Sequence, residues 1–268
     1  MFDILQYTFM RNATYAGILA SLIFGIIGTL VVVKRIVFIS GGIAHASFGG
    51  VGMAFYLGID PLIGASLFTV VSALGVGILG ERKMEREDTT IGVIWAVGMA
   101  LGAFFYSITP GYLPSPASFL FGNIVMIRRL DILLLMTLTM VILLSVTFFY
   151  HKLHAISFDE EFSKVVGVNT FYLNILLLLL VAFSIVFLIK FVGIILVIAL
   201  LTIPASISNH FTHDMKRIMV YSSILSLTFI MSGLWISHTV DTAAGPTIVL
   251  LAGGVFVLIT VLSKFLKH

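Results

Sequence analysis

Long uncharged apolar runs are the feature that most constrains what this chain folds into. Two of them, Ile132–Tyr150 and Phe171–Ile189, contain no Asp, Glu, Lys or Arg, and each has nearly the ~20 residues that a helix needs to cross a bilayer. Neither run alternates polar and apolar residues as the strands of a membrane barrel do. The composition agrees, because 60% of the 268 residues are hydrophobic and 10% are charged. We therefore predict an all-α, polytopic membrane helix bundle that forms a single transmembrane domain over residues 1–268.

Charged clusters, glycines and prolines divide this bundle into about eight to nine transmembrane helices. The expected spans lie at about Tyr15–Val33, Ile36–Leu57, Pro61–Leu79, Thr90–Ile108, Ile132–Phe149, Phe171–Ile189, Phe191–Ser208, Ile218–Ser237 and Thr247–Leu262. A further apolar piece, Phe119–Ile127, is too short to span the membrane. Pro204 predicts a kink or break within its span.

The distribution of Lys and Arg predicts the orientation of the bundle. If the connection at Lys34 and Arg35 is cytoplasmic, alternation of the spans places 11 of the 15 basic residues on the cytoplasmic side and four on the other. Because positive residues accumulate in cytoplasmic connections, we expect the N-terminus outside and the C-terminus inside. The same alternation makes residues 151–170 the one long cytoplasmic loop.

Several classes of function lack their sequence signals. No G-x-x-x-x-G-K-[ST] phosphate loop occurs, so ATP-driven work would need a separate polypeptide. No H-E-x-x-H motif or nucleophile elbow occurs, and the absence of cysteine removes disulfides and thiol chemistry. The basic residues lie at helix ends, which the positive-inside rule explains without nucleic acid. We therefore expect no enzymatic activity, no bound cofactor and no nucleic-acid partner.

His45 is the ionisable side chain that the sequence places at mid-membrane. It lies in the segment Ser40–Gly52, which contains five glycines that allow close helix approach or a break in the helix. Ionisable residues inside a span mark functional sites by default, and a neutral imidazole suits Zn²⁺ or Mn²⁺. A histidine that is hydrogen-bonded to a neighbouring helix for packing is the alternative, and the sequence leaves both open.

His238 and Asp241 form a second, weaker candidate at an external helix junction. Asp241 lies three positions after His238, so the two side chains share a face if the turn is helical. A carboxylate with an imidazole suits a hydrated divalent ion. A solvated pair of loop side chains is the alternative.

The loop at residues 151–170 contains a short, capped amphipathic helix. Asp159 is the expected N-cap, Glu160 and Glu161 occupy the first turn, and Gly167 is the expected stop. The apolar residues Phe162, Val165 and Val166 follow at helical spacing. Such a helix fits a groove of another protein, or it lies in the membrane interface without a partner.

Together these motifs resemble the permease subunits of metal-uptake ABC transporters of the zinc/manganese type. The resemblance runs in order over roughly residues 15 to 262. The segments that carry it are Ala44–Gly52, Asp88–Gly92, Phe119–Gly122, Phe158–Val168, Lys190–Ala205 and Asp241–Pro246.

The resemblance implies partners that the chain itself does not encode. They are a second copy of the permease, a cytoplasmic ATPase subunit that binds ATP, and an extracellular or periplasmic metal-binding protein, with membrane lipid around the dimer. The segment from Asp159 to Gly167 would be the coupling helix, with Asp159, Glu160, Glu161, Phe162, Val166 and Gly167 facing the ATPase. The location implied is the cytoplasmic, or inner, membrane of a prokaryote.

The family pattern in the second span pairs an Asp with a His four residues later. His45 matches the histidine, but the carboxylate position is Gly41 here, so the carboxylate is not carried over. We therefore predict an ATP-driven importer whose cargo is most readily Zn²⁺, with Mn²⁺ or Fe²⁺ as alternatives. An ion-gradient-driven secondary transporter of a small cation is the competing function, although it needs buried acidic residues and the acidic residues here lie at segment ends.

Overall fold

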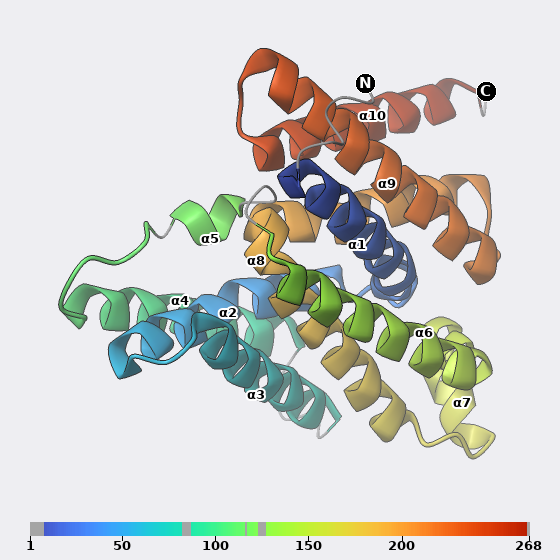
Figure 1. The fold of residues 1–268 in the computed structure, drawn as a ribbon. Helices are drawn as coiled ribbons and strands as arrows, with labels where there is room; N and C mark the ends of the chain where they lie inside the picture. The colour runs from blue at the N-terminus through green and yellow to red at the C-terminus, as the bar shows by residue number, and fades with distance from the viewer. Residues whose placement is uncertain (1–7, 82–86, 116, 123–126, 267–268) are drawn as a thin grey trace. The chain divides into compact units, whose positions relative to one another are not determined.

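The computed structural model describes residues 8–81, 87–115, 117–122 and 127–266. Residues 123–126 of the short piece expected at Phe119–Ile127, and the basic residues 82, 83 and 86, lie outside this described part. The described residues form helices α1 (Thr8–Val33), α2 (Val37–Leu57), α3 (Pro61–Glu81), α4 (Glu87–Ile108), α5 (Ala117–Phe121), α6 (Arg129–Phe158), α7 (Glu160–Val165), α8 (Thr170–Phe211), α9 (Met215–Val240) and α10 (Ala244–Leu266) (Figure 1).

The predicted helical membrane bundle is confirmed. Eight of these helices, all except α5 and α7, are long and apolar enough to cross a membrane. The helices form two compact units. Unit 1 comprises Met1–Val32, Ala117–Val141 and Phe191–His268, and unit 2 comprises Val33–Pro116 and Ile142–Lys190. The single transmembrane domain stays a prediction.

Unit 2 is built around α2, which packs against both α3 and α4 (Figure 1). The close approach to α4 depends on glycine, since a Cβ at Gly49 or Gly52 would collide with the α4 backbone at Gly98 or Gly102. Thirteen of the 21 residues of α2 are buried, so most of this helix faces other helices and not lipid. The glycine-rich segment therefore acts here as a close-packing surface.

Unit 1 brings together α1, α9, α10 and the second part of α8. The α1 side chains Ile23, Phe24 and Ile27 are fully buried. The Ser222 hydroxyl of α9 donates a buried hydrogen bond of 3.1 Å to the Ser208 hydroxyl of α8. An apolar core and a polar contact between helices thus hold unit 1 together, as is usual for helices packed in a membrane.

Helix α8 consists of two helices that join at a kink, and these correspond to the two expected spans Phe171–Ile189 and Phe191–Ser208. The backbone at the kink is non-helical at Gly193, with φ 77° and ψ 163°. Pro204 lies inside the second helix without a break in the backbone, so the break occurs at Gly193, and the kink expected at Pro204 stays a prediction. Glycine adopts a positive φ at little cost, which explains why the break falls there.

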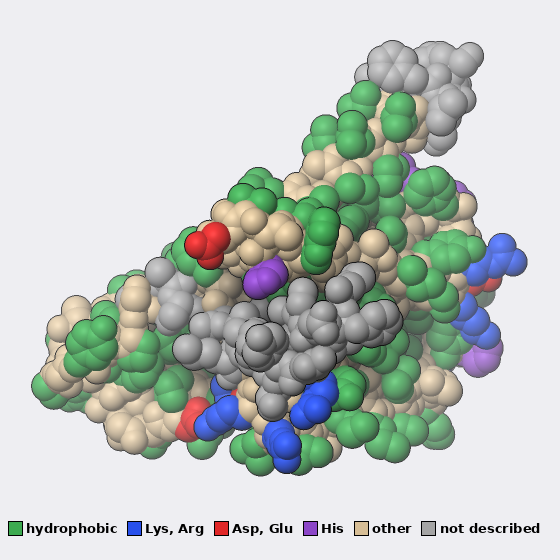
Figure 2. All heavy atoms as spheres, turned by 45° about the horizontal axis from the view of Figure 1, so that its top comes forward, with side chains coloured by type: hydrophobic (Ala, Val, Ile, Leu, Met, Phe, Trp, Pro, Cys, Tyr) green, Lys and Arg blue, Asp and Glu red, His purple; other side chains and the backbone are tan. Residues whose placement is uncertain are grey.

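Exposed apolar side chains mark the outward faces of the spans. On α6 they follow a helical stripe that comprises Leu133, Met136, Met140, Leu144 and Phe148. Charged side chains are few and lie in small groups (Figure 2). In water such a surface would aggregate, whereas in a bilayer it is the surface that lipid covers, and the protein is a multi-pass membrane protein.

Candidate functional site

His45 lies on α2 against the indole of Trp95 on α4. The two rings are stacked, with centroids 4.5 Å apart and planes 9° from parallel. His45 lies eight positions after Val37, the first residue of α2. This spacing places His45 about 12 Å along the helix axis from the start of α2. The stacking fixes the plane of the imidazole, so its two nitrogens point along that plane and away from the Trp95 face.

One imidazole nitrogen of His45 is buried without a partner. The Nδ1 atom is shielded from solvent and makes no hydrogen bond within the described part of the chain. A buried polar atom without a partner costs free energy, so its persistence calls for an explanation such as a ligand. The alternative read from the sequence, a histidine hydrogen-bonded to a neighbouring helix for packing, finds no support at this nitrogen.

The position four residues before His45 is open. A Cβ built at Gly41 meets no atom within 4 Å, whereas a Cβ at the adjacent Gly42 would collide with the Ile91 side chain. Residues i and i+4 lie on the same helix face. The missing carboxylate at Gly41 therefore leaves free space on the face that carries His45.

The second metal candidate has a different setting. His238, in the last turn of α9, and Asp241, the residue that ends α9, are both exposed and belong to unit 1, whereas His45 belongs to unit 2. Asp241 has a left-handed backbone with φ 55° and its N–H bonds the Ser237 carbonyl, so its position serves to end the helix. In the described ranges, no three His, Asp or Glu side chains are grouped so that they could hold a metal ion.

The predicted short helix in the loop is confirmed as α7. Asp159 is its N-cap and accepts a hydrogen bond of 2.8 Å from the Phe162 N–H. Gly167 follows the helix with φ 84°, a conformation that favours glycine. Phe162 and Val166 are exposed and Ser163 is buried, so α7 presents an apolar face outward.

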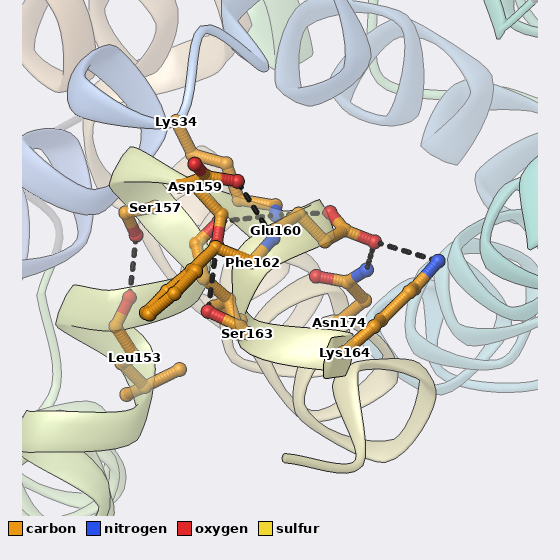
Figure 3. Close-up of polar contacts among 10 residues, drawn as sticks. Lys34, Leu153, Ser157, Asp159, Glu160, Phe162, Ser163, Lys164 and Asn174 are labelled. Atoms are coloured by element: carbon orange, nitrogen blue, oxygen red, sulfur yellow. Dashed lines mark hydrogen bonds and ion pairs between the residues drawn. The ribbon is translucent and has the colours of Figure 1, made fainter. Parts of the chain in front are cut away.

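Glu160, the first residue of α7, has partners on three segments (Figure 3). Its Oε2 accepts a hydrogen bond of 2.9 Å from Lys34 Nζ, and its Oε1 accepts one of 2.9 Å from Asn174 Nδ2. Lys164 Nζ lies 3.4 Å from Oε1. Burial alone raises the pKa of the Glu160 carboxyl, but the hydrogen bond and charge of Lys34, the bond from Asn174 and the charge of Lys164 together lower this pKa below its usual value. Glu160 is therefore a fixed negative charge at the membrane edge.

A cavity of about 440 Å³ adjoins this cluster in unit 2. The charged residues Lys34, Glu160, Glu161 and Lys164 lie on its lining, together with apolar residues of α2, α3 and α8. Glu160 and Glu161 were predicted from the sequence as site residues. Lys34, Asn174 and Trp95 were not predicted as site residues. Lys34 and Asn174 are 126 and 14 residues from Glu160, and no local pattern relates residues across such distances.

Three of the segments that carried the family resemblance meet in unit 1. A second cavity, of about 290 Å³, is lined by residues of all three, including Gly122, Val192 and Gly245. Gly122 and Gly193 both have positive φ, and a Cβ on either would collide with the backbone of the other segment. These three segments, which lie far apart in the sequence, thus form one joint between α5, the break in α8 and the α9–α10 turn.

The chain is similar to known membrane transport proteins over most of its length. Residues 6–263 match the model of the ABC 3 transport family. A probable metal transport system membrane protein of Chlamydia trachomatis is 37% identical over 91% of this chain and 86% of its own length. A manganese transport system membrane protein of Listeria monocytogenes, MntC, is 28% identical over 94% of this chain and 90% of its own.

A solved structure agrees over nearly the whole length. PsaBC from Streptococcus pneumoniae, in complex with Fab, superposes with a TM-score of 0.83 at 28% identity, over 96% of this chain and 93% of the matched chain. The resemblance inferred from the sequence motifs is therefore confirmed. The chain belongs to the ABC 3 transport family, as a membrane-spanning subunit of that family.

Proposed function

We propose that this chain forms the membrane path of an ATP-driven importer of a divalent transition metal. In this proposal it works with a second copy of itself, with a separate ATPase at the α7 end of unit 2, and with a binding protein that delivers the ion from outside. Family membership and the names of the relatives support the class of transporter. The observation that carries the role of this chain is the His45 Nδ1, which is buried in a span and has no hydrogen-bond partner among the described residues.

The orientation in the proposal follows from the basic residues of unit 2. Among the Lys and Arg residues of unit 2 that the structure describes, Lys190 belongs to one end, and the others belong to the end that carries α7, namely Lys34, Arg35, Lys152 and Lys164. Positive residues accumulate on the cytoplasmic side, so α7 faces the cytoplasm, where ATP is available. The N-terminus is then outside and the C-terminus inside.

The outward face of α7 is the proposed contact with the ATPase. Phe162, Val165 and Val166 are all more than half exposed, beside the acidic Glu161. Apolar side chains anchored on a capped helix fit a groove of a partner protein, and the resemblance implies that this partner is the ATPase.

The cargo is proposed as Mn²⁺ or Zn²⁺, and two observations favour different ions. Several relatives are named manganese transport system membrane proteins. The imidazole of His45 without a carboxylate at Gly41 suits the softer Zn²⁺. The predicted preference for zinc therefore stays a prediction, and direct competition between the two ions decides it.

The proposal is tested by replacing His45. In vesicles that hold the complete transporter, we expect His45→Ala to lower ATP-dependent uptake of Mn²⁺ and Zn²⁺ by at least about tenfold, because loss of a ligand costs at least as much as loss of its supporting contacts. The matched control is His151→Ala, an exposed histidine on α6, which should leave uptake unchanged. Normal uptake by His45→Ala, with the ATPase still bound, would contradict the proposed role.

The open space at Gly41 allows a second variant that separates the two metals. Gly41→Asp adds a hard carboxylate on the face of His45, at a position where the Cβ has no atom within 4 Å. We therefore expect uptake to shift toward Mn²⁺ in a competition between equal concentrations of the two ions. An unchanged ratio would mean that residue 41 does not face the ion. If uptake instead persists without ATP and collapses with the ion gradient, the chain is a secondary transporter.

A further inference from the structure

The ion pair between Lys34 and Glu160 joins two parts of unit 2 that have different roles in the proposed function. Glu160 begins α7, the helix proposed to contact the ATPase. Lys34 lies in the short turn that leads into α2, the helix that carries His45. The pair is the polar contact through which the loop helix is fixed to this turn (Figure 3).

Lys34 makes a second contact that fixes its position further. Its Nζ donates a hydrogen bond of 3.2 Å to the carbonyl of Ile156 in the last turn of α6, and its side chain is only 13% exposed. A lysine held by a carboxylate and a helix-terminal carbonyl is oriented by both. Lys34 therefore bridges the end of α6 and the start of α7.

The chain between Lys34 and α2 is short and bent. Arg35 has a left-handed backbone with φ 62°, and α2 begins at Val37. No flexible linker intervenes, so a displacement of Lys34 moves the first turn of α2. From there, a rigid helix extends about 12 Å to His45.

We propose that Lys34 is a positioning residue that transmits movement of α7 to α2, and so links the ATPase contact to the metal path. This inference rests on the proposed function. An ion pair that only holds α7 in place would lose the ATPase when it is broken. A transmitting pair, in contrast, keeps the ATPase bound and loses the link between ATP hydrolysis and α2.

The first test compares variants for the number of metal ions transported per ATP hydrolysed. In the complete reconstituted transporter, Lys34→Met should lower this ratio about tenfold, within the usual range of coupling between linked sites, while the ATPase still copurifies. Exchanging the charges, with Lys34→Glu and Glu160→Lys together, should restore most of the ratio. Lys164→Gln is the matched control, because it removes a cation from the same carboxylate but one that lies within α7 itself.

Two results of this test would overturn the inference. One is a wild-type ratio in Lys34→Met. The other is loss of the ATPase from Lys34→Met without rescue by the charge exchange, which would show a purely structural role.

A second measurement does not depend on the cargo. Gly41→Cys introduces the only cysteine of the chain at a position with space for it, close to His45 on α2. In the complete complex, ATP should change the rate at which a maleimide labels this cysteine, and Lys34→Met should abolish that change. If the wild-type complex moves no metal but ATP still changes the labelling through Lys34, the proposed cargo is wrong and the transmission is right. An ATP effect that survives Lys34→Met overturns the transmission.

Discussion

The cavity beside α7 in unit 2 and the cavity beside α5 in unit 1 are built by opposite means. The cavity of unit 2 is lined in part by charged side chains, and long flexible residues such as Lys34 and Glu160 hold its elements together. The described residues that line the cavity of unit 1 are all uncharged, and its elements meet backbone to backbone at Gly122 and Gly193. Side chains therefore join the elements around the cavity of unit 2, whereas main-chain atoms join the elements around the cavity of unit 1.

This difference has a mechanical consequence. Two helices joined by a hydrogen-bonded ion pair can move together while the pair stays intact, so a contact of this kind allows movement and passes it on. Two backbones in direct contact have no such freedom, because the packed interior does not deform continuously. We therefore expect the α7 region to move during the cycle and the glycine joint of unit 1 to remain rigid.

The largest effect is expected at the joint of unit 1. Gly193→Ala would force a side chain into a left-handed backbone and against the backbone of α5. Left-handed strain and overpacking together should cost about 2–5 kcal/mol of stability. Thermal unfolding of the purified protein in detergent measures this loss, and wild-type thermal stability would show that the joint is not rigid.

A smaller effect is expected from the corresponding change beside α7. Gly167 also has a positive φ, but a Cβ there meets no atom within 4 Å. Gly167→Ala should therefore cost only the backbone strain, about 1–2 kcal/mol. Measured by the same unfolding assay, a loss equal to that of Gly193→Ala would remove the distinction between the two regions.

The smallest effect is the pH dependence of the Lys34–Glu160 contact. Because the pKa of Glu160 lies below its usual value of 4.5, the pair stabilises the docked α7 fully above that pH. The stabilisation is lost as the pH falls through the lowered pKa, when the carboxylate binds a proton. For a partly exposed pair it amounts to at most about 1 kcal/mol.

Hydrogen exchange of the α7 amides, corrected for the intrinsic pH dependence of exchange, measures this release. Protection should decrease below pH 4.5 in the wild type. Glu160→Gln should show the reduced protection at every pH, and a wild-type pH profile in that variant would assign the transition to another carboxyl group.

Much of the architecture was predictable because its causes are local. The spans follow from runs of apolar residues, and α7 from a capping residue, two acidic residues and a glycine stop, all within nine positions from Asp159 to Gly167. The boundary between the two spans of α8 was expected between Ile189 and Phe191 and occurs at Gly193, whereas no break occurs at Pro204. A proline inside a helix removes one backbone hydrogen bond, and a membrane helix can satisfy the freed group locally. The break at Gly193 has a different cause, because there the backbone of α8 lies against a segment that is distant in the sequence.

The candidate site was predictable only in part. His45 stood out because an ionisable residue in a span is costly, but nothing in the sequence paired it with Trp95, 50 residues later. The same holds for Glu160, whose acidic character was visible while its partners Lys34 and Asn174 were not. Contacts between helices depend on rotation and register, and an apolar helix sequence leaves both undetermined.

The sequence by itself determined that this protein crosses a membrane, where most spans lie, and which family it belongs to. The spans depend on the free energy of transferring apolar segments into lipid, which adds up residue by residue along the chain. The family is visible in short motifs, each of which lies within one stretch of sequence. Only the tertiary structure decided which histidine nitrogen lacks a partner, which lysine reaches Glu160 and where two backbones meet. These are pairwise contacts between distant residues, and packing sets them once the helices are already in place.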